Sequence, residues 1–221
     1  MNSKVFCDRI TASTYEQKVV SDNPYFSSMI DLFLHRFDHH YVLVENKDKQ
    51  LYIKQKIVEI ATAIDEDSKN SYDRFSYLKC MNATSIQHGL QKGDTVSALL
   101  YLSDLYNVSS KVYIASTTTY VNTSDKTREP FSILFTNGKW SELTEEPPFT
   151  EGEFTCLGEC VVLDVDTKDV YKKYLQPIGK YKAPELIEIA KSMNIPIETD
   201  GKKKVKKTLY DDINIYQLNL S

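Results

Sequence analysis

Two amphipathic patterns near the C-terminus constrain the fold more tightly than any other part of this 221-residue sequence. Pro184 suits the first turn of a helix, because the N–H that proline lacks would have no partner there. The pattern that begins at Pro184 ends before Pro196, since the residue preceding a proline avoids the α region. The apolar positions of the two patterns have helical spacing: Leu186, Ala190 and Met193, then Val205, Leu209 and Ile213. The sequence therefore predicts two short helices that pack as a helical hairpin.

A dense group of lysines lies where the second of these helices is expected to begin. The group consists of Lys202, Lys203, Lys204, Lys206 and Lys207. Positive charge in the first turns of a helix costs roughly 0.3–1 kcal/mol per residue, so folding alone does not explain this placement. A phosphate partner would explain it, because free backbone N–H groups and ammonium groups would converge on one anion. The alternative is a solvated face, which is the usual role of a lysine run.

The segment PELIEIAKSMNIP, the GKK after it and the central leucine of the second helix resemble a SAP motif, a small helix–extended–helix DNA-binding module. The ending GKKKVKKTLYDDI also resembles C-terminal segments in proteins of nucleocytoplasmic large DNA viruses. The resemblance covers residues 179–221 only. It implies that the second helix and the residues before it approach DNA. By position, the implied contacts are Gly201, Lys202, Lys203, Lys204, Lys206 and Lys207, with Lys182 as a further candidate.

The loop between the two expected helices departs from what a DNA-binding module needs. Glu198 and Asp200 lie in it, and their carboxylates would repel a phosphate backbone. This departure lowers the expected affinity for DNA and leaves a protein-binding role open.

Charge divides the chain into two parts of opposite sign. Residues 180–221 hold eight lysines and six acidic residues, a formal charge of +2. The remaining residues hold 19 Lys or Arg and 25 Asp or Glu, a formal charge of −6. An acidic body is not suited to bind duplex DNA, so any nucleic-acid contact is expected in the tail. We therefore expect an acidic body in residues 1–178 and a SAP-like module in residues 179–221.

Composition narrows the class of protein further. Hydrophobic residues make up 41% of the chain, which is enough for a packed core. No apolar run approaches the roughly 18 residues of a membrane span, and the start MNSKVFCDRI lacks the apolar stretch of a secretory signal. The four cysteines form no dense framework. We expect an intracellular protein without a membrane partner, and the viral resemblance implies a host nucleus, a cytoplasmic viral factory or the virion.

Helical patterns come first in the body and strand patterns follow. Helices are expected over residues 23–40, 51–65, 72–80 and 94–105, with a loop over 82–92. Strands are expected over residues 111–114, 117–121, 131–135, 139–143 and 160–165, and a short helix over 166–175. Asn137-Gly138 is the strongest turn signal, because this dipeptide fits a type I′ hairpin. The fold class is α+β: N-terminal helices plus a small, mostly antiparallel sheet, then the two-helix module.

Three groups of residues could suggest a metal site, and none of them is convincing. His35 and His39 have the spacing of two ligands on one helix, with His40 beside them, but a third ligand is missing. Cys156 and Cys160 have an unusual spacing for zinc and fit two small core residues better. The pair Asp164 and Asp166 could bind a divalent ion, although Asp166 as a helix cap explains it more simply. No metal or cofactor is expected.

Signals for catalysis are equally weak. No phosphate-binding loop motif occurs in the sequence. Cys80 and His88 could be imagined as a nucleophile and its base, but no motif supports them. The order of helices and strands loosely resembles papain-like and deubiquitinase-like folds, whose nucleophile signatures are absent. Trp140 is interpreted as a core residue, with a stacking platform as the alternative if it is exposed.

These observations favour a non-enzymatic protein of a large DNA virus. Its tail would bind DNA phosphates with weak sequence preference, and its body would bind a protein partner that the sequence does not identify. The first alternative is a virion structural or assembly protein whose tail docks on an acidic protein surface. The second is a divergent cysteine hydrolase, which would require Cys80 and His88 to lie within hydrogen-bond reach.

Overall fold

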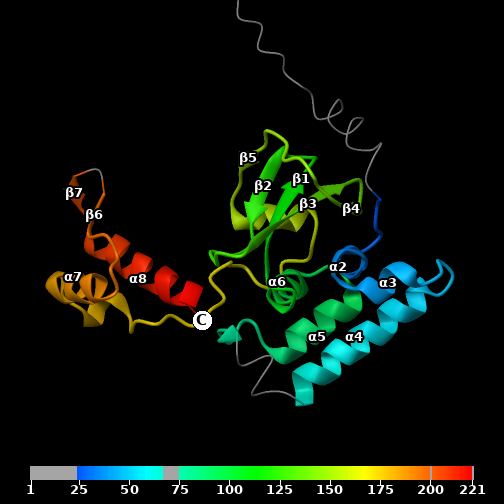
Figure 1. Cartoon of the computed structure of the whole chain (residues 1–221), viewed down its shortest axis with the longest axis horizontal. Coiled ribbons are helices and arrows are strands. Elements are labelled where there is room, and N and C mark those ends of the chain that lie inside the picture. The colour runs from blue at the N-terminus through cyan, green and yellow to red at the C-terminus, as the bar shows by residue number, and fades with distance from the viewer. Residues whose placement is uncertain (1–23, 67–74, 200, 221) are drawn as a thin grey trace, which may run out of the picture.

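Helices precede strands along the body, and a separate group of elements forms the C-terminal region (Figure 1). The computed structural model describes residues 24–66, 75–199 and 201–220. The helices of the body are α2 (Met29–Phe37), α3 (His39–Leu43), α4 (Lys49–Glu66), α5 (Ala83–Lys92) and α6 (Val96–Leu105). The strands of the body are β1 (Val108–Ile114), β2 (Thr119–Asn122), β3 (Glu129–Thr136), β4 (Lys139–Glu142) and β5 (Thr150–Glu151). The α+β class is confirmed.

The five strands form a mixed sheet in the order β4-β3-β1-β2-β5. The central strand β1 pairs antiparallel with β2, but it runs parallel to β3 from Val108↔Glu129 to Ile114↔Phe135. The expectation of a mostly antiparallel sheet was therefore wrong. The reason lies in residues 123–128, which return the chain across the start of β1, where Thr123 binds the carbonyl oxygen of Ser110 through both its N–H and its hydroxyl.

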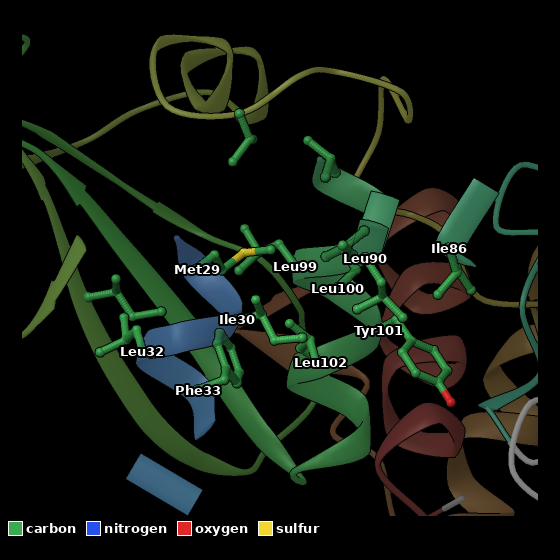
Figure 2. Close-up of a cluster of buried hydrophobic side chains, with 14 of the residues drawn as sticks. Met29, Ile30, Leu32, Phe33, Ile86, Leu90, Leu99, Leu100, Tyr101 and Leu102 are labelled. Carbon is green, nitrogen blue, oxygen red and sulfur yellow. The ribbon is translucent and has the colours of Figure 1, made fainter. Parts of the chain in front are cut away.

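The core lies between this sheet and two helices. α6 is buried at every position from Val96 to Asp104, and α2 lies beside it. Figure 2 shows side chains of α2, α5 and α6 meeting in this core. The ring of Phe33 on α2 meets Phe131 of β3 edge to face, with centroids 5.2 Å apart. Burial of such apolar surface is the main stabilising contribution to the fold.

The β3–β4 hairpin confirms the prediction from Asn137-Gly138. Both residues have positive φ, 50° and 73°, as a type I′ turn requires. The register places Trp140 opposite Phe135, with ring centroids 4.9 Å apart. Trp140 is only 1% exposed, so it is a core residue and offers no stacking surface to a ligand.

A buried carboxylate connects α6 to three other stretches of the chain. Asp104, 2% exposed, accepts hydrogen bonds from the hydroxyls of Tyr77 and Tyr171 and pairs with the guanidinium of Arg128. The ammonium of Lys126 lies 3.8 Å from the carboxylate and 4.4 Å from the centroid of the Tyr171 ring. Burial and the nearby Asp104 charge raise the pKa of Tyr171 above its usual range, so its hydroxyl stays protonated and donates.

Several local expectations fail where tertiary contacts dominate. The helix expected over residues 23–40 breaks at Asp38, whose carboxylate caps the N-terminus of α3. The helix expected over 72–80 begins outside the described residues, and its described part, 75–80, contains no α-helix. The strand expected over 160–165 and the helix over 166–175 are replaced by irregular chain. The helix expected over 51–65 and the one at 94–105 are confirmed as α4 and α6.

The loop expected over 82–92 is the helix α5. Asn82 caps it, with its side-chain oxygen 2.9 Å from the N–H of Ser85, and Gly93 ends it in the left-handed region at φ 90°. Gly89 permits close approach to the start of α6, since a Cβ there would lie 2.1 Å from Oγ1 of Thr95. Gly89, although glycine is a weak helix former, therefore has a packing role.

We predict that Asp104→Ala strongly destabilises the fold. The substitution removes the carboxylate that pairs with the buried guanidinium of Arg128, and breaking a buried ion pair in this way costs about 3–5 kcal/mol. Urea unfolding monitored by circular dichroism measures the change. Asp125→Ala is the matched control, because its pair with Lys168 is about half exposed and should change the stability by less than about 1 kcal/mol. Equal effects of the two substitutions would contradict the assigned role of Asp104.

Gly89→Ala should lower stability although alanine favours a helix. The added Cβ clashes with the buried hydroxyl of Thr95, and overpacking of this kind costs about 1–3 kcal/mol. Gly179→Ala is the control, since a Cβ at that position meets open space. The midpoints of thermal unfolding should fall for the first variant and stay unchanged for the second; a stabilised Gly89→Ala protein would refute the packing argument.

Candidate nucleic-acid interface

The C-terminal region has its own apolar cluster, which holds its two helices together. The helices are α7 (Ala183–Ser192) and α8 (Lys206–Leu220). The buried members of the cluster are Leu175, Leu186, Ala190, Ile195, Leu209, Tyr210 and Ile213. Two helices packed on each other were expected from the stripes, and five of the six stripe residues lie in or against this cluster. The sixth, Val205, lies before α8 and is 67% exposed, so its assignment to the stripe was wrong.

A small β-hairpin separates the two helices, and the sequence interpretation missed it. β6 (Glu198–Thr199) pairs antiparallel with β7 (Lys202–Lys203). Gly201 in the turn has φ 72°, a conformation that glycine adopts without strain. Lys202, Lys203 and Lys204 therefore lie in and just after a strand, and not in the first turns of a helix as expected. The hairpin lies at the end of the module away from the sheet of the body (Figure 1).

The lysines selected from the sequence are not equivalent in the structure. Lys202, Lys203 and Lys207 are exposed, and Lys206 is partly exposed, at the hairpin and the first turn of α8. These four side chains and Gly201 occupy one continuous stretch of chain. We call the four side chains of Lys202, Lys203, Lys206 and Lys207 the lysine patch. Lys182 is exposed on a different element, at the N-cap of α7, where its backbone N–H donates to Glu185 at 2.6 Å.

Lys204 differs from the lysine patch because its charge is already paired. Its ammonium lies 2.7 Å from the Oδ2 atom of Asp212 on α8, and its side chain is 13% exposed. Its backbone N–H donates to the carbonyl oxygen of Ile197 at 2.9 Å. Lys204 is therefore a structural residue in this conformation, and its ammonium is not presented to solvent as a phosphate contact would be.

Glu198 also acts within the hairpin. It is the direct cross-strand partner of Lys203, while Thr199 lies opposite Lys202. Directly opposed residues on neighbouring strands lie close together, so the Glu198 carboxylate lowers the attraction of a phosphate to Lys203, although no ion pair joins the two among the described residues. The repulsion of phosphate expected from Glu198 would therefore act next to Lys203. Asp200 lies outside the described residues.

α8 extends from the lysine patch to the body. The sequence did not predict the hydrogen bonds that its side chains make there. The side-chain oxygen of Asn219 accepts a hydrogen bond from the N–H of Thr127, and Leu218 packs against the core of the body. Nearer the middle of the helix, the side-chain oxygen of Asn214 accepts from the N–H of Leu175 at 3.0 Å. The module is therefore anchored to the body by the second half of α8, and the lysine patch lies at the opposite end of that helix.

A cavity of about 300 Å³ lies at this junction. It is lined by Lys168, Lys172, Lys173, Asp125, Asp169 and Asp211, among others. Two of its lysines are paired, Lys168 with Asp125 at 3.3 Å and Lys173 with Asp169 at 3.0 Å. The balance of charges gives the cavity no preference for an anion or a cation.

The histidine and cysteine candidates gain no support as metal ligands. Because the helix breaks at Asp38, His35 belongs to α2 while His39 and His40 belong to α3. The described residues contain no group of three or more His, Cys, Asp or Glu placed to hold a metal ion. Cys156 and Cys160 are partly buried against the core, and burial raises the pKa of Cys160 to about 12. These cysteines match the expected role of small core residues.

Of the remaining polar candidates, Asp164 has a structural role, and Cys80 and His88 do not bind each other. Asp164 caps α6, accepting from the backbone N–H of Ser97 at 2.9 Å and from its hydroxyl. The expected helix cap at Asp166 was therefore wrong, because residues 166–175 form no helix and Asp164 caps a helix that precedes it in the chain. Cys80 lies exposed before α5, His88 lies exposed on it, and no hydrogen bond joins them in the described part of the chain.

A groove with both apolar and polar side chains in its lining lies on the surface of the body between α4 and α5. Its volume is about 410 Å³, and its lining includes Ile57, Val58 and Ala61 of α4 and Gln87 and Gln91 of α5. Val58 is 63% exposed, and Leu51 lies two turns before it on the same helix, also exposed. Exposed apolar side chains grouped in this way are typical of protein-binding surfaces.

Comparisons with other proteins add no constraint on these assignments. Within the described ranges, none of the helices is both long and apolar enough to cross a membrane. No protein-family model, curated protein or solved structure matches the chain.

Proposed function

We propose that this protein is a non-enzymatic DNA-binding protein that contacts phosphates through the lysine patch. The observation that carries the proposal is the placement of four solvent-accessible ammonium groups on consecutive elements, of which none has an ion-pair partner among the described residues. The first turn of α8 adds free backbone N–H groups beside them. Lys182 would add a further contact only if the DNA also reached α7.

The expected binding is weak and electrostatic. Lysine contacts to phosphates read no sequence, so the preference among DNA sequences should be small. Four phosphate contacts give a slope of about −3.6 for the logarithm of the binding constant against the logarithm of salt concentration. One copy should bind with a dissociation constant on the order of micromolar to tenths of millimolar at physiological salt.

The body then has the separate role of binding a protein partner. The groove between α4 and α5 supports this assignment, because Val58 in its lining is exposed to solvent. A partner bound there would add avidity to weak DNA binding. The viral resemblance implies that this would take place in a host nucleus, a viral factory or a virion.

Duplex binding by the full chain tests the proposal. In fluorescence anisotropy, changing the four residues of the lysine patch to glutamine should abolish binding, because it removes every phosphate contact of the patch. The matched control changes four exposed lysines of the body to glutamine: Lys54, Lys79, Lys92 and Lys139. It alters net charge equally and should leave binding nearly unchanged.

Equal loss in both quadruple variants would mean that net charge governs binding and not the lysine patch. Binding of the wild type to polyglutamate in preference to DNA at equal salt would instead favour docking of the tail on an acidic protein surface. Absence of DNA binding at low salt would refute the proposal.

Glu198→Gln should tighten DNA binding about twofold to threefold at low salt. The substitution removes a negative charge from the position directly opposite Lys203, and interactions between exposed cross-strand charges contribute about 0.2–1 kcal/mol. Glu188→Gln on α7 is the control, since it removes the same charge outside the hairpin. If both variants bind equally tightly, the cross-strand position of Glu198 has no specific effect.

A further inference from the structure

We infer that the ion pair between Lys204 and Asp212 positions the β6–β7 hairpin for DNA binding, so that an acidic residue of α8 strengthens binding to an acidic ligand. The inference rests on the proposed function and assigns Lys204 and Asp212 as positioning residues. The resemblance to a SAP motif had instead placed Lys204 among the DNA contacts.

An ion pair connects the end of the hairpin to α8. Lys204 directly follows β7, and its side chain reaches Asp212, eight residues along, at 2.7 Å. The side chain of Asp212 is 30% exposed, so the pair is partly withdrawn from water and its attraction is less screened than at an open surface. The backbone N–H of Lys204 also binds Ile197, just before β6. One residue thus joins both ends of the hairpin to the helix.

The hairpin needs such an anchor because it has little stability of its own. Each strand contains two residues, and all four are exposed. A two-stranded hairpin is marginal in water even when it is longer. Without the pair, Lys202 and Lys203 would lose their fixed position relative to Lys206 and Lys207. Fixing them during binding would then cost free energy that the anchored hairpin avoids.

Simple electrostatics predicts the opposite effect of the same substitution. Removing the charge of Asp212 makes the module more positive and releases the Lys204 ammonium. On charge alone, both changes strengthen attraction to phosphates. The sign of the change in affinity therefore separates positioning from charge.

The first experiment compares Asp212→Asn with Glu198→Gln in the full chain, using duplex DNA anisotropy at low salt. Each variant removes one negative charge from the module. We expect Glu198→Gln to bind about twofold to threefold more tightly and Asp212→Asn to bind about fivefold more weakly than the wild type. Equal or tighter binding by Asp212→Asn overturns the inference.

The second experiment asks whether the contact itself is responsible. Lys204→Asp and Asp212→Lys should each weaken binding relative to the wild type, and the double variant that exchanges the two charges should restore it. Restoration would occur with an aspartate at position 204, which excludes a direct phosphate contact by that residue. If the double variant binds no better than Lys204→Asp, the positioning role is wrong.

Salt dependence supplies a readout that a general loss of structure would not give. Lys202→Gln should reduce the magnitude of the salt slope by about 0.9, as loss of one phosphate contact requires. Lys204→Gln should weaken binding with the slope unchanged, and a matching decrease in its slope would make Lys204 a phosphate contact after all.

If the wild type does not bind DNA, the proposed function fails and this inference fails with it. If the wild type binds and only the Asp212 and Lys204 results disagree with expectation, the lysine patch remains the DNA contact and the positioning role of the ion pair is wrong.

Discussion

The buried carboxylate of Asp104 holds separate stretches of the chain against α6, and the arrangement of the body depends on it. Tyr77 arrives from the segment before α5, Arg128 and Lys126 from the connection between β2 and β3, and Tyr171 from the segment that leads to the module. None of these segments has a long apolar stretch of its own. Their position is set by charge and hydrogen bonding inside the core, where an unpaired partner would be costly.

The same connection between β2 and β3 links the body to the module. Thr127 lies between the two cations that bind Asp104, and its N–H meets Asn219 near the end of α8. Tyr171 fixes the other chain segment at this junction, four residues before Leu175 enters the apolar cluster of the module. Stabilisation of the body by Asp104 therefore also fixes the base on which α8 rests.

Local sequence signals predicted the elements whose structure depends on local chemistry. The Asn137-Gly138 hairpin and α6 follow from turn chemistry and apolar content, and both were found. α5 was missed because Gly89 weakens a helical pattern unless its contact with Thr95 is known. The parallel pairing of β1 with β3 depends on the path of residues 123–128 across the start of β1, which no local pattern encodes. In the candidate site, the lysines were visible in the sequence, but the pair with Asp212 was not, because an ion pair between a residue after a strand and a residue eight positions later in the following helix has no sequence signature. The Asp200-Gly201 dipeptide, a hairpin signal in its own right, could have revealed β6 and β7.

The contacts of α8 with the body bear on how the two parts move. With Leu218 packed on the core and Asn219 bonded to Thr127, the helix couples the rotation of the module to that of the body. A duplex bound at the far end of α8 would therefore be held at a fixed angle to the body, and not by a flexible linker. Each bound copy would then hold the groove between α4 and α5 at the same angle to its own segment of DNA. This angle would be set by the protein alone, without any reading of the bases.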